Sequence, residues 1–195
     1  MKIYTRKGDK GQTGVFGGKR ESKDSPRIEC NGAIDEANAT LGLLRSQLPI
    51  KHEWQKRMQI IQKDLMDMMS HLARPSVSKK ENPNPKPIHG SAMCETWIDE
   101  IEAHMSSPSD YFLLPGGNLL SSLCHVFRTQ IRRAERRLIS LEKVDPDSVE
   151  DYAMAYLNRL SDLAFLWARR FMEKDKIQEE RWQLFLYKRK KKHGE

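Results

Sequence analysis

The sequence contains few of the features that define secreted, membrane or metal-binding proteins. Its three cysteines, Cys30, Cys94 and Cys124, are far apart and form no Cys-x-x-Cys pair, so neither a disulfide framework nor a zinc site is predicted. No apolar run approaches the roughly 20 residues of a membrane-spanning helix. The first residues are charged or glycine where a signal peptide would be apolar. We therefore expect a cytoplasmic protein without a membrane partner.

Several common catalytic and nucleotide-binding motifs are also missing. None of the six histidines has a glutamate three residues before it, which argues against a di-metal site of the ferritin type. His125 follows Cys124, but no third group can be placed to orient it, so Cys–His catalysis is not favoured. Gly18-Lys19 is followed by Arg20 rather than Ser or Thr, which excludes a Walker loop. Too little chain precedes the first glycine to supply a dinucleotide-binding strand.

Positive charge is in excess, and part of it lies at the C-terminal end. The formal net charge is +7, and Lys188–Lys192 is an unbroken basic run. Such a run is usually a solvated tail, and the alternative is an electrostatic contact with nucleic acid. We favour the tail. The length of 195 residues suits one domain, so we predict a single domain over residues 1–180 and a basic tail over residues 181–195.

The most informative stretch that is present is glycine-rich and N-terminal, within residues 1–27. Five glycines alternate there with cations, hydroxyls and a carboxylate: Thr5, Arg6, Lys7, Gly8, Asp9, Lys10, Gly11, Thr13, Gly14, Gly17, Gly18 and Lys23. Glycine leaves backbone N–H groups open, so successive amides can converge on an anion. The segment is therefore either a phosphate-binding loop or a flexible basic tail with turns, and its local chemistry does not decide between the two.

From Pro26 onward, apolar residues recur at three- and four-residue steps, which predicts helices. We expect helices over about residues 28–48, 53–73, 91–105 and 119–141, and a last one from Ser148, as its N-cap, to about residue 173. Four prolines between residues 75 and 87 predict a loop. No segment alternates as a strand would. The sequence therefore predicts an all-α, five-helix bundle.

Polar residues lie beside the apolar stripes of these helices. Arg128, Arg132 and Glu135 share one helix face. They form either a solvated surface with one weak ion pair, or a grip for a triphosphate with the glutamate serving a metal or hydroxyl. Asp35 lies next to apolar helix positions and could pair with an arginine from another helix or subunit. Asn158 either contacts a base or ribose or is an ordinary interhelical amide.

Taken in order, these blocks resemble the trimeric ATP:cob(I)alamin adenosyltransferases of the PduO type. The resemblance covers about residues 3–173. It is carried by Thr5-Arg6-x-Gly8-Asp9-x-Gly11-x-Thr13-Gly14, Gly32-x-x-Asp35-Glu36-x-Asn38, Phe112-Leu113-Leu114-Pro115-Gly116-Gly117, His125-Val126-x-Arg128-Thr129-x-x-Arg132-Arg133-Ala134-Glu135 and Tyr156-Leu157-Asn158-Arg159.

The resemblance implies a homotrimer of five-helix bundles with active sites at the subunit interfaces. It implies that the N-terminal loop covers Mg-ATP beside a bound corrinoid. Cob(I)alamin would attack the 5′ carbon of ATP, forming adenosylcobalamin and releasing triphosphate. A flavoprotein reductase and an adenosylcobalamin-dependent enzyme are the further partners it implies.

The resemblance also implies residue roles. The residues that match the ATP site are Thr5, Arg6, Gly8, Asp9, Gly11, Thr13, Gly14, Lys23, Arg132, Glu135 and Asn158; those that match catalytic positions are Phe112, Arg128, Arg132 and Glu135. Mg²⁺ would bind through ATP, with Glu135 as its candidate protein contact. Phe112 matches the aromatic that displaces the lower axial ligand of Co(II) and contacts the corrinoid, and Asp35 matches a residue that bridges subunits through Arg128.

The aromatic residues Trp182, Phe185 and Tyr187 are candidates to fold over the corrinoid, as the C-terminal segment does in some members of the family. The competing hypothesis is a non-catalytic, basic helical protein that binds nucleic acid through its arginine helix and lysine-rich tail. It is less favoured because a charged patch requires neither the Gly-Asp-x-Gly motif nor Asp35 and Asn158.

Overall fold

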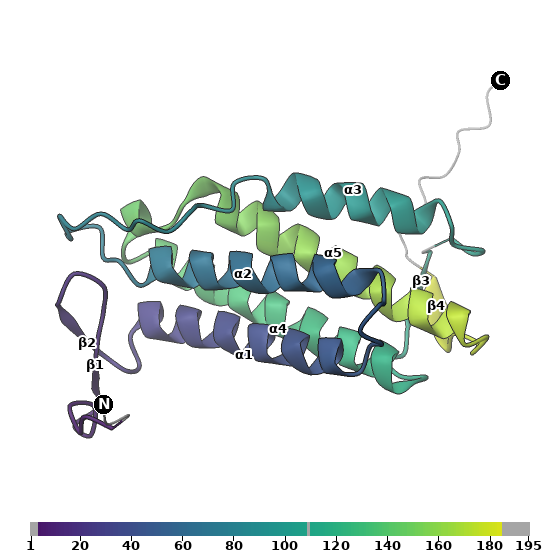
Figure 1. Ribbon diagram of the computed structural model, residues 1–195, viewed down its shortest axis with the longest axis horizontal. Coiled ribbons are helices and arrows are strands. Elements are labelled where there is room, and N and C mark those ends of the chain that lie inside the picture. The colour runs from purple at the N-terminus through teal and green to yellow at the C-terminus, as the bar shows by residue number, and fades with distance from the viewer. Residues whose placement is uncertain (1–3, 109, 185–195) are drawn as a thin grey trace.

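The computed structural model describes residues 4–108 and 110–184, and the side chains of residues 183 and 184 are not described. The α-helices run roughly along one long axis (Figure 1). They are α1 (Pro26–Ser46), α2 (Trp54–Leu72), α3 (Gly90–Glu102), α4 (Leu119–Glu142) and α5 (Asp151–Lys174). The predicted five-helix bundle is confirmed. Within the described ranges, no helix is long and apolar enough to cross a membrane.

Helix starts follow local capping chemistry, with one correction to the prediction. Ser25 caps α1 by accepting a hydrogen bond from the Ile28 amide, and Asn118 caps α4 in the same way. Ser148, predicted to cap α5, instead lies in a 3₁₀ turn (Pro146–Ser148), and α5 begins at Asp151. The Ser148 hydroxyl donates to the Asp145 carbonyl at 2.8 Å, so it is used by the preceding turn.

The helices α4 and α5 form the centre of the bundle. Their largest fully buried side chains are Phe127, Tyr156 and Trp167. Helix α1 packs on α4, α3 packs on α5, and α2 packs on α1. Burial of these apolar stripes supplies the main driving force for the fold. The polar faces of α4 and α5 that border this core are therefore held rigidly.

Four short strands were not predicted. Strands β1 (Gln12–Gly14) and β2 (Arg20–Ser22) form a hairpin, and β3 (Tyr111–Leu113) pairs antiparallel with β4 (Arg181–Leu184). Strands of three or four residues are too short to show a period of two. The partner of β3 is also far away in the sequence. Strand β4 lies within the segment predicted as a tail, and it pairs with the body of the domain.

The two small sheets lie at opposite ends of the bundle. The β1–β2 hairpin lies beside the start of α1, and the β3–β4 pair lies beside the start of α4 and the end of α5 (Figure 1). The predicted proline-rich loop is confirmed as irregular chain between α2 and α3. The hairpin is bonded to the end of α2, just before this loop: the Phe16 amide donates to the Ala73 carbonyl at 2.9 Å.

Candidate active site

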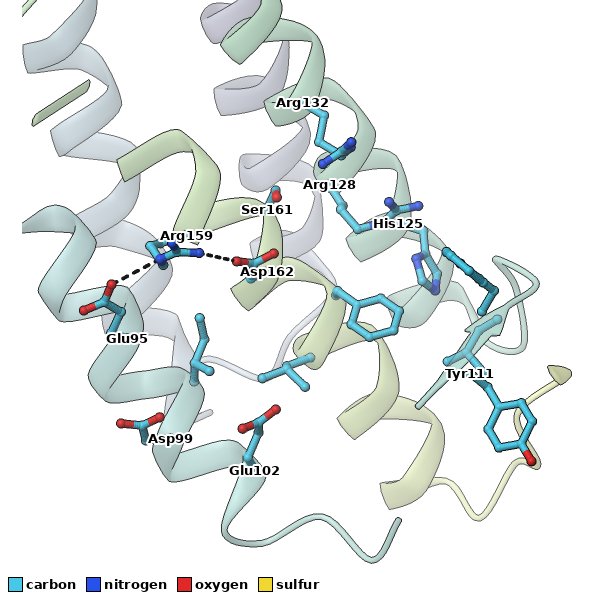
Figure 2. Close-up of a pocket in the computed structure, with 15 residues that line it drawn as sticks. Glu95, Asp99, Glu102, Tyr111, His125, Arg128, Arg132, Arg159, Ser161 and Asp162 are labelled. Carbon is cyan, nitrogen blue, oxygen red and sulfur yellow. Dashed lines mark hydrogen bonds and ion pairs between the residues drawn. The ribbon is translucent and has the colours of Figure 1, made fainter. Parts of the chain in front are cut away.

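A cavity of about 660 Å³ lies between α3, α4, α5 and β3 (Figure 2). Its lining mixes apolar and charged side chains: Glu95, Ile98, Asp99, Glu102, Tyr111, Phe112, Leu113, His125, Arg128, Arg132, Arg159, Ser161, Asp162, Phe165 and Leu166. Three of the four predicted catalytic residues, Phe112, Arg128 and Arg132, therefore meet in one cavity. A concave, partly apolar site with a few converging charges is typical of a small-molecule site.

One wall of the cavity is a face of α4 that carries His125, Arg128 and Arg132. Burial, and then the neighbouring charge of Arg132, lowers the pKa of Arg128. The buried Nε of Arg128 has no hydrogen-bond partner within the described part of the chain. A guanidinium with unused donors is suited to oxyanions, which it can bind with two parallel hydrogen bonds. This wall can therefore bind a phosphate chain.

His125 is the most enclosed polar side chain of that wall, with 6% of its surface exposed. Burial, followed by the charge of Arg128, lowers its pKa to about 4. Its Nδ1 has no hydrogen-bond partner among the residues described. The preceding Cys124 is fully buried, and burial raises the pKa of its thiol. A thiol held protonated in this way is a poor nucleophile, which agrees with setting Cys–His catalysis aside.

Glu135 and Asn158 are brought together by α4 and α5. Asn158 Nδ2 donates to Glu135 Oε1 at 3.0 Å, and Asn158 Oδ1 accepts from Arg159 at 3.0 Å. Arg159 in turn pairs with Asp162 at 2.8 Å and with Glu95 at 3.1 Å. The glutamate is thus bonded to Asn158, and this network joins the predicted ATP residues to the wall of the cavity.

Phe112 stands in β3 at the edge of the cavity, and 47% of its surface is exposed. Its ring centroid is 6.3 Å from that of Trp182 in β4, in an edge-to-face arrangement. An exposed aromatic pair beside a cavity is suited to a flat, apolar ligand. The other two predicted aromatic residues, Phe185 and Tyr187, lie outside the described residues, as does the basic run of residues 188–192.

The remaining predicted ATP residues lie in the hairpin segment, at the other end of the bundle from Phe112 (Figure 1). They are Thr5, Arg6, Gly8, Asp9, Gly11, Thr13, Gly14 and Lys23. The Arg20 guanidinium holds the segment in shape by donating to the carbonyls of Lys7 and Gln12. A Cβ placed on Gly8 would lie 3.3 Å from Lys23 Nζ. The Lys23 ammonium therefore lies next to the turn that contains Gly8.

Gly17 shows why glycine is needed in this segment. It has a φ of +92°, and a Cβ there would collide with the Ser78 hydroxyl of the proline-rich loop. A second cavity of about 490 Å³ is lined by the polar side chains of the segment, Arg6, Lys7, Asp9, Lys10, Gln12 and Arg20. The segment is therefore folded on itself, with several basic groups around one hollow.

Arg27 fixes this segment to the bundle, and sequence reasoning missed it. Only 4% of its side chain is exposed, and it forms ion pairs with Glu21 of β2, at 3.0 Å, and with Asp145 after α4. It also donates to the Leu72 carbonyl at the end of α2. An arginine in the first turn of an amphipathic helix is usually a surface residue, so the sequence carried no signal for this role.

Asp35 and Arg128 are not bonded to one another within the chain described. Asp35 is exposed on α1, and Arg128 faces the cavity from α4. The bridge between subunits that the resemblance implies therefore stays a prediction.

Comparison with known proteins gives a match over nearly the whole bundle. The sequence model of the family described as "Cobalamin adenosyltransferase" matches residues 3–171. The chain belongs to the cobalamin adenosyltransferase family. This membership favours the enzyme over the competing hypothesis of a non-catalytic nucleic-acid-binding protein.

Individual members of the cobalamin adenosyltransferase family agree with this assignment. The chain is 40% identical to the corrinoid adenosyltransferase of Bacillus subtilis, over 87% of this chain and 86% of that protein. It is 38% identical to the corrinoid adenosyltransferase PduO of Salmonella typhimurium, over 87% of this chain but 49% of that longer protein.

Solved structures of the family share the fold. A variant of the PduO-type ATP:corrinoid adenosyltransferase from Lactobacillus reuteri, complexed with cobalamin and ATP, superposes with a TM-score of 0.85 at 30% identity. The similarity covers 93% of this chain and 99% of that chain. A second variant of the same enzyme, complexed with ATP, gives a TM-score of 0.84.

Proposed function

We propose that this protein transfers the 5′-deoxyadenosyl group of ATP to the cobalt of cob(I)alamin or a corrinoid precursor. The products are adenosylcobalamin and triphosphate. One observation carries the proposal: Arg128 and Arg132 line the same cavity as the exposed Phe112, in a chain whose solved relative was complexed with cobalamin and ATP. The cavity thus combines cations for a phosphate chain with aromatic surface for a corrin ring.

The chemistry needs positioning and charge stabilisation rather than a base. The Co(I) electron pair attacks C5′ of ATP, a Co–C bond forms, and the C5′–O bond breaks with its electrons leaving on triphosphate. Holding the two substrates in line lowers the entropic part of the barrier. Fixed cations at the leaving group stabilise its developing charge. Arg128 and Arg132 supply those cations from α4, and Lys23 supplies one from the N-terminal segment.

We propose that the active site forms between subunits of a homotrimer. In one chain, the segment that carries Gly8 and Lys23 lies at the opposite end of the bundle from the cavity end that carries Phe112 (Figure 1). A second copy that places its N-terminal segment over the cavity would bring the two halves together. An ion pair between Asp35 of one copy and Arg128 of the next would fix that arrangement, and it explains why the charged face of α4 borders the core.

Mg²⁺ is proposed to bind through ATP rather than in a site built by the protein. The part of the chain that the structure describes contains no group of three His, Cys, Asp or Glu side chains arranged to hold a metal ion. Glu135 is the carboxylate nearest in sequence to Arg132 on the proposed ATP face, and Asn158 orients it. Bound Mg²⁺ offsets the negative charge of the triphosphate.

Phe112 is proposed to occupy the lower axial face of the corrinoid. A phenyl ring there excludes the axial ligand and water from Co(II), and a four-coordinate Co(II) is easier to reduce. Electrons would come from a flavoprotein reductase in the cytoplasm, and the product would pass to an adenosylcobalamin-dependent enzyme. The domain proposed for this work has residues 1–27 as its ATP loop, and it extends beyond the predicted boundary at residue 180 to include β4, which pairs with β3.

The direct test is an anaerobic reaction of chemically reduced cobalamin with Mg-ATP, followed by the visible spectrum. We expect the Co(I) spectrum to convert to that of adenosylcobalamin, with triphosphate as the second product. Arg132→Ala should abolish most of the turnover. Arg137→Ala is the matched control, because Arg137 lies on the same helix and is exposed outside the cavity. Folded wild-type enzyme that gives no conversion would overturn the proposal.

A further inference from the structure

A buried arginine that the proposed chemistry does not use lies near the C-terminal end of α5. Only 2% of the Arg169 side chain is exposed. Its Nε donates to Glu179 Oε1 at 2.6 Å, and its Nη2 donates to Glu179 Oε2 at 3.1 Å. Glu179 follows α5, and only 15% of its side chain is exposed. Two parallel hydrogen bonds between a guanidinium and a carboxylate fix both the distance and the orientation of the pair.

The same guanidinium also holds the segment that precedes β3. Nη2 of Arg169 donates to the carbonyls of Ser107 and Pro108, both at 3.3 Å, and to the Ser107 hydroxyl at 3.0 Å. Strand β3 begins at Tyr111, and strand β4 begins at Arg181. Arg169 therefore joins three parts of the chain at one buried point: α5, the segment before β3 and the segment before β4.

The sheet that Arg169 holds carries Phe112. In this sheet Phe112 of β3 pairs with Gln183 of β4, and the Leu114 amide donates to the Glu180 carbonyl at 2.9 Å. The two strands lie side by side at the end of α5 (Figure 1). The Phe112 ring is half-exposed, so its own burial contributes little to holding it. A sheet of two such short strands is marginally stable by itself. The position of the ring therefore depends on where the sheet is attached to the bundle.

Arg169 lies behind the wall of the large cavity rather than in its lining. A small cavity of about 40 Å³ is lined by Arg169, Glu179 and His125. His125 also lines the large cavity, whereas Arg169 and Glu179 do not. An effect of Arg169 on the reaction must then pass through the residues that it holds in place.

We propose that Arg169 is a positioning residue for the adenosyltransferase reaction. Through Glu179 and the segment of Ser107 and Pro108 it holds β3, and so it places the Phe112 ring at the lower axial face of the corrinoid. The inference rests on the proposed function and on the role proposed for Phe112 in that site. A displacement of about 1 Å at such a ring can cost about a hundredfold in rate.

This role concerns the step that precedes attack on ATP. When the reaction starts from Co(II), the ring must exclude the lower axial ligand before a reduced flavin supplies one electron to the cobalt. Cob(I)alamin that is supplied already reduced does not need this step. Loss of Arg169 should therefore slow the reaction from Co(II) much more than the reaction from Co(I). A merely structural role would slow both by the same factor, because unfolded protein is inactive in either assay.

The test uses Arg169→Met in the full chain with Mg-ATP. From cob(II)alamin and a reduced flavin, we expect adenosylcobalamin to form about tenfold more slowly than with the wild type, and from cob(I)alamin less than about twofold more slowly. Electron paramagnetic resonance of the bound cob(II)alamin should show a smaller four-coordinate fraction. Arg57→Met is the matched control and should change neither rate. Arg57 also pairs with a glutamate of another element, Glu100 of α3, but it lies outside both cavities.

A second variant keeps the test decisive if Arg169→Met folds poorly. Arg169→Met leaves the Glu179 carboxylate buried without its partner, which is destabilising, whereas replacing both members of a buried ion pair by apolar residues is often neutral. Arg169→Met/Glu179→Met should therefore restore the folded fraction, measured by urea denaturation. It should not restore the rate from Co(II), because the hydrogen bonds to Ser107 and Pro108 are still lost.

A double-variant cycle shows whether Arg169 acts through Phe112. Phe112→Ala removes the ring that Arg169 is proposed to position. Adding Arg169→Met to Phe112→Ala should therefore slow the reaction from Co(II) no further.

The outcomes separate this proposal from the proposed function. If the wild-type enzyme adenosylates cobalamin in neither assay, the proposed function fails. If the wild type is active and Arg169→Met slows the two assays by the same factor, or slows neither, the positioning role is overturned. A further loss of about tenfold in the Phe112→Ala background also overturns it, because Arg169 would then act independently of Phe112.

Discussion

Asn158 of α5 donates a hydrogen bond to Glu135 of α4 across 3.0 Å. The bond joins the two central helices, and the carbonyl of the same amide accepts from Arg159 at the edge of the large cavity. Two residues that the sequence suggested separately as ATP contacts are therefore one structural unit. Substituting either residue removes the hydrogen bond that positions the other.

The first prediction follows from this unit. Glu135→Ala and Asn158→Ala should each lower kcat/KM for ATP by about tenfold, which is the loss of one charge-assisted hydrogen bond. The double variant should be no worse than the worse single variant, because the bond is already lost in each. Thr129→Ala, an exposed change on α4, is the control. Losses that multiply in the double variant would show that the two residues act independently.

The second prediction concerns Arg27, whose buried guanidinium joins β2, the end of α2 and Asp145. Burial alone would raise the pKa of Asp145, but hydrogen bonds from Ser76 and the charge of Arg27 lower it overall. Arg27→Ala leaves buried acceptors without a partner and should reduce the free energy of unfolding by about 3–5 kcal/mol, measured by urea denaturation.

The control for Arg27 is Arg137→Ala. Arg137 is exposed and its ion pair with Glu29, at 3.5 Å, is also exposed, so its removal should change the free energy of unfolding by less than about 1 kcal/mol. Equal effects of the two substitutions would contradict the structural role of Arg27.

The third prediction is a pH dependence of stability. Burial, followed by the charge of Arg128, lowers the pKa of His125 from 6.5 to about 4. Between these values the unfolded state binds more protons, so the free energy of unfolding falls as the pH falls from about 6.5 towards 4. The contribution of His125 to the free energy of unfolding is fully present above about pH 6.5. About 2 kcal/mol of it is lost by pH 5.

The measurement is urea denaturation at pH 7 and at pH 5. His125→Gln cannot titrate, so the variant should lose about 2 kcal/mol less than the wild type between these two pH values. Identical losses in the two proteins would contradict the placement of a neutral, buried His125.

The fourth prediction separates two roles of Phe112. If its ring displaces the lower ligand of Co(II), Phe112→Ala should slow turnover by about tenfold when the assay starts from cob(II)alamin and a mild reductant. It should change the rate far less when cob(I)alamin is supplied already reduced. Leu114→Ala, an exposed apolar change outside the large cavity, is the control. Equal losses in both assays would mean that the ring only binds the corrinoid.

The sequence predicted the helices well because each is long and its apolar residues recur over several turns. It missed the strands because three residues of β3 carry no period, and their partner follows only after α4 and α5. Ser148 was assigned as a cap from its residue type, but a local hydrogen bond to Asp145 uses its hydroxyl. Sequence patterns therefore predict helices of several turns, but they do not predict strands of three residues or the exact residue at which a helix begins.

The sequence predicted only part of the candidate site, because a helical repeat shows which residues share a face but not what that face contacts. Arg128 and Arg132 were found because steps of four residues place them together on one helix. Asp99 and Glu102 were missed, and His125 was considered only as a partner of Cys124, because a helix face does not reveal which neighbour it meets. The α3 carboxylates have the pattern of a solvated surface until the packing of α3 on α5 places them across from α4.

The most direct test of the account is whether one active site is shared between two copies of the chain. Lys23→Glu disables the N-terminal segment, and Arg132→Ala disables the cavity, so each variant alone should form almost no adenosylcobalamin. When the two are co-assembled in equal amounts, a shared site regains one intact segment and one intact cavity in about a quarter of cases. About a quarter of wild-type activity should therefore return, whereas no recovery in mixed trimers would contradict a shared site.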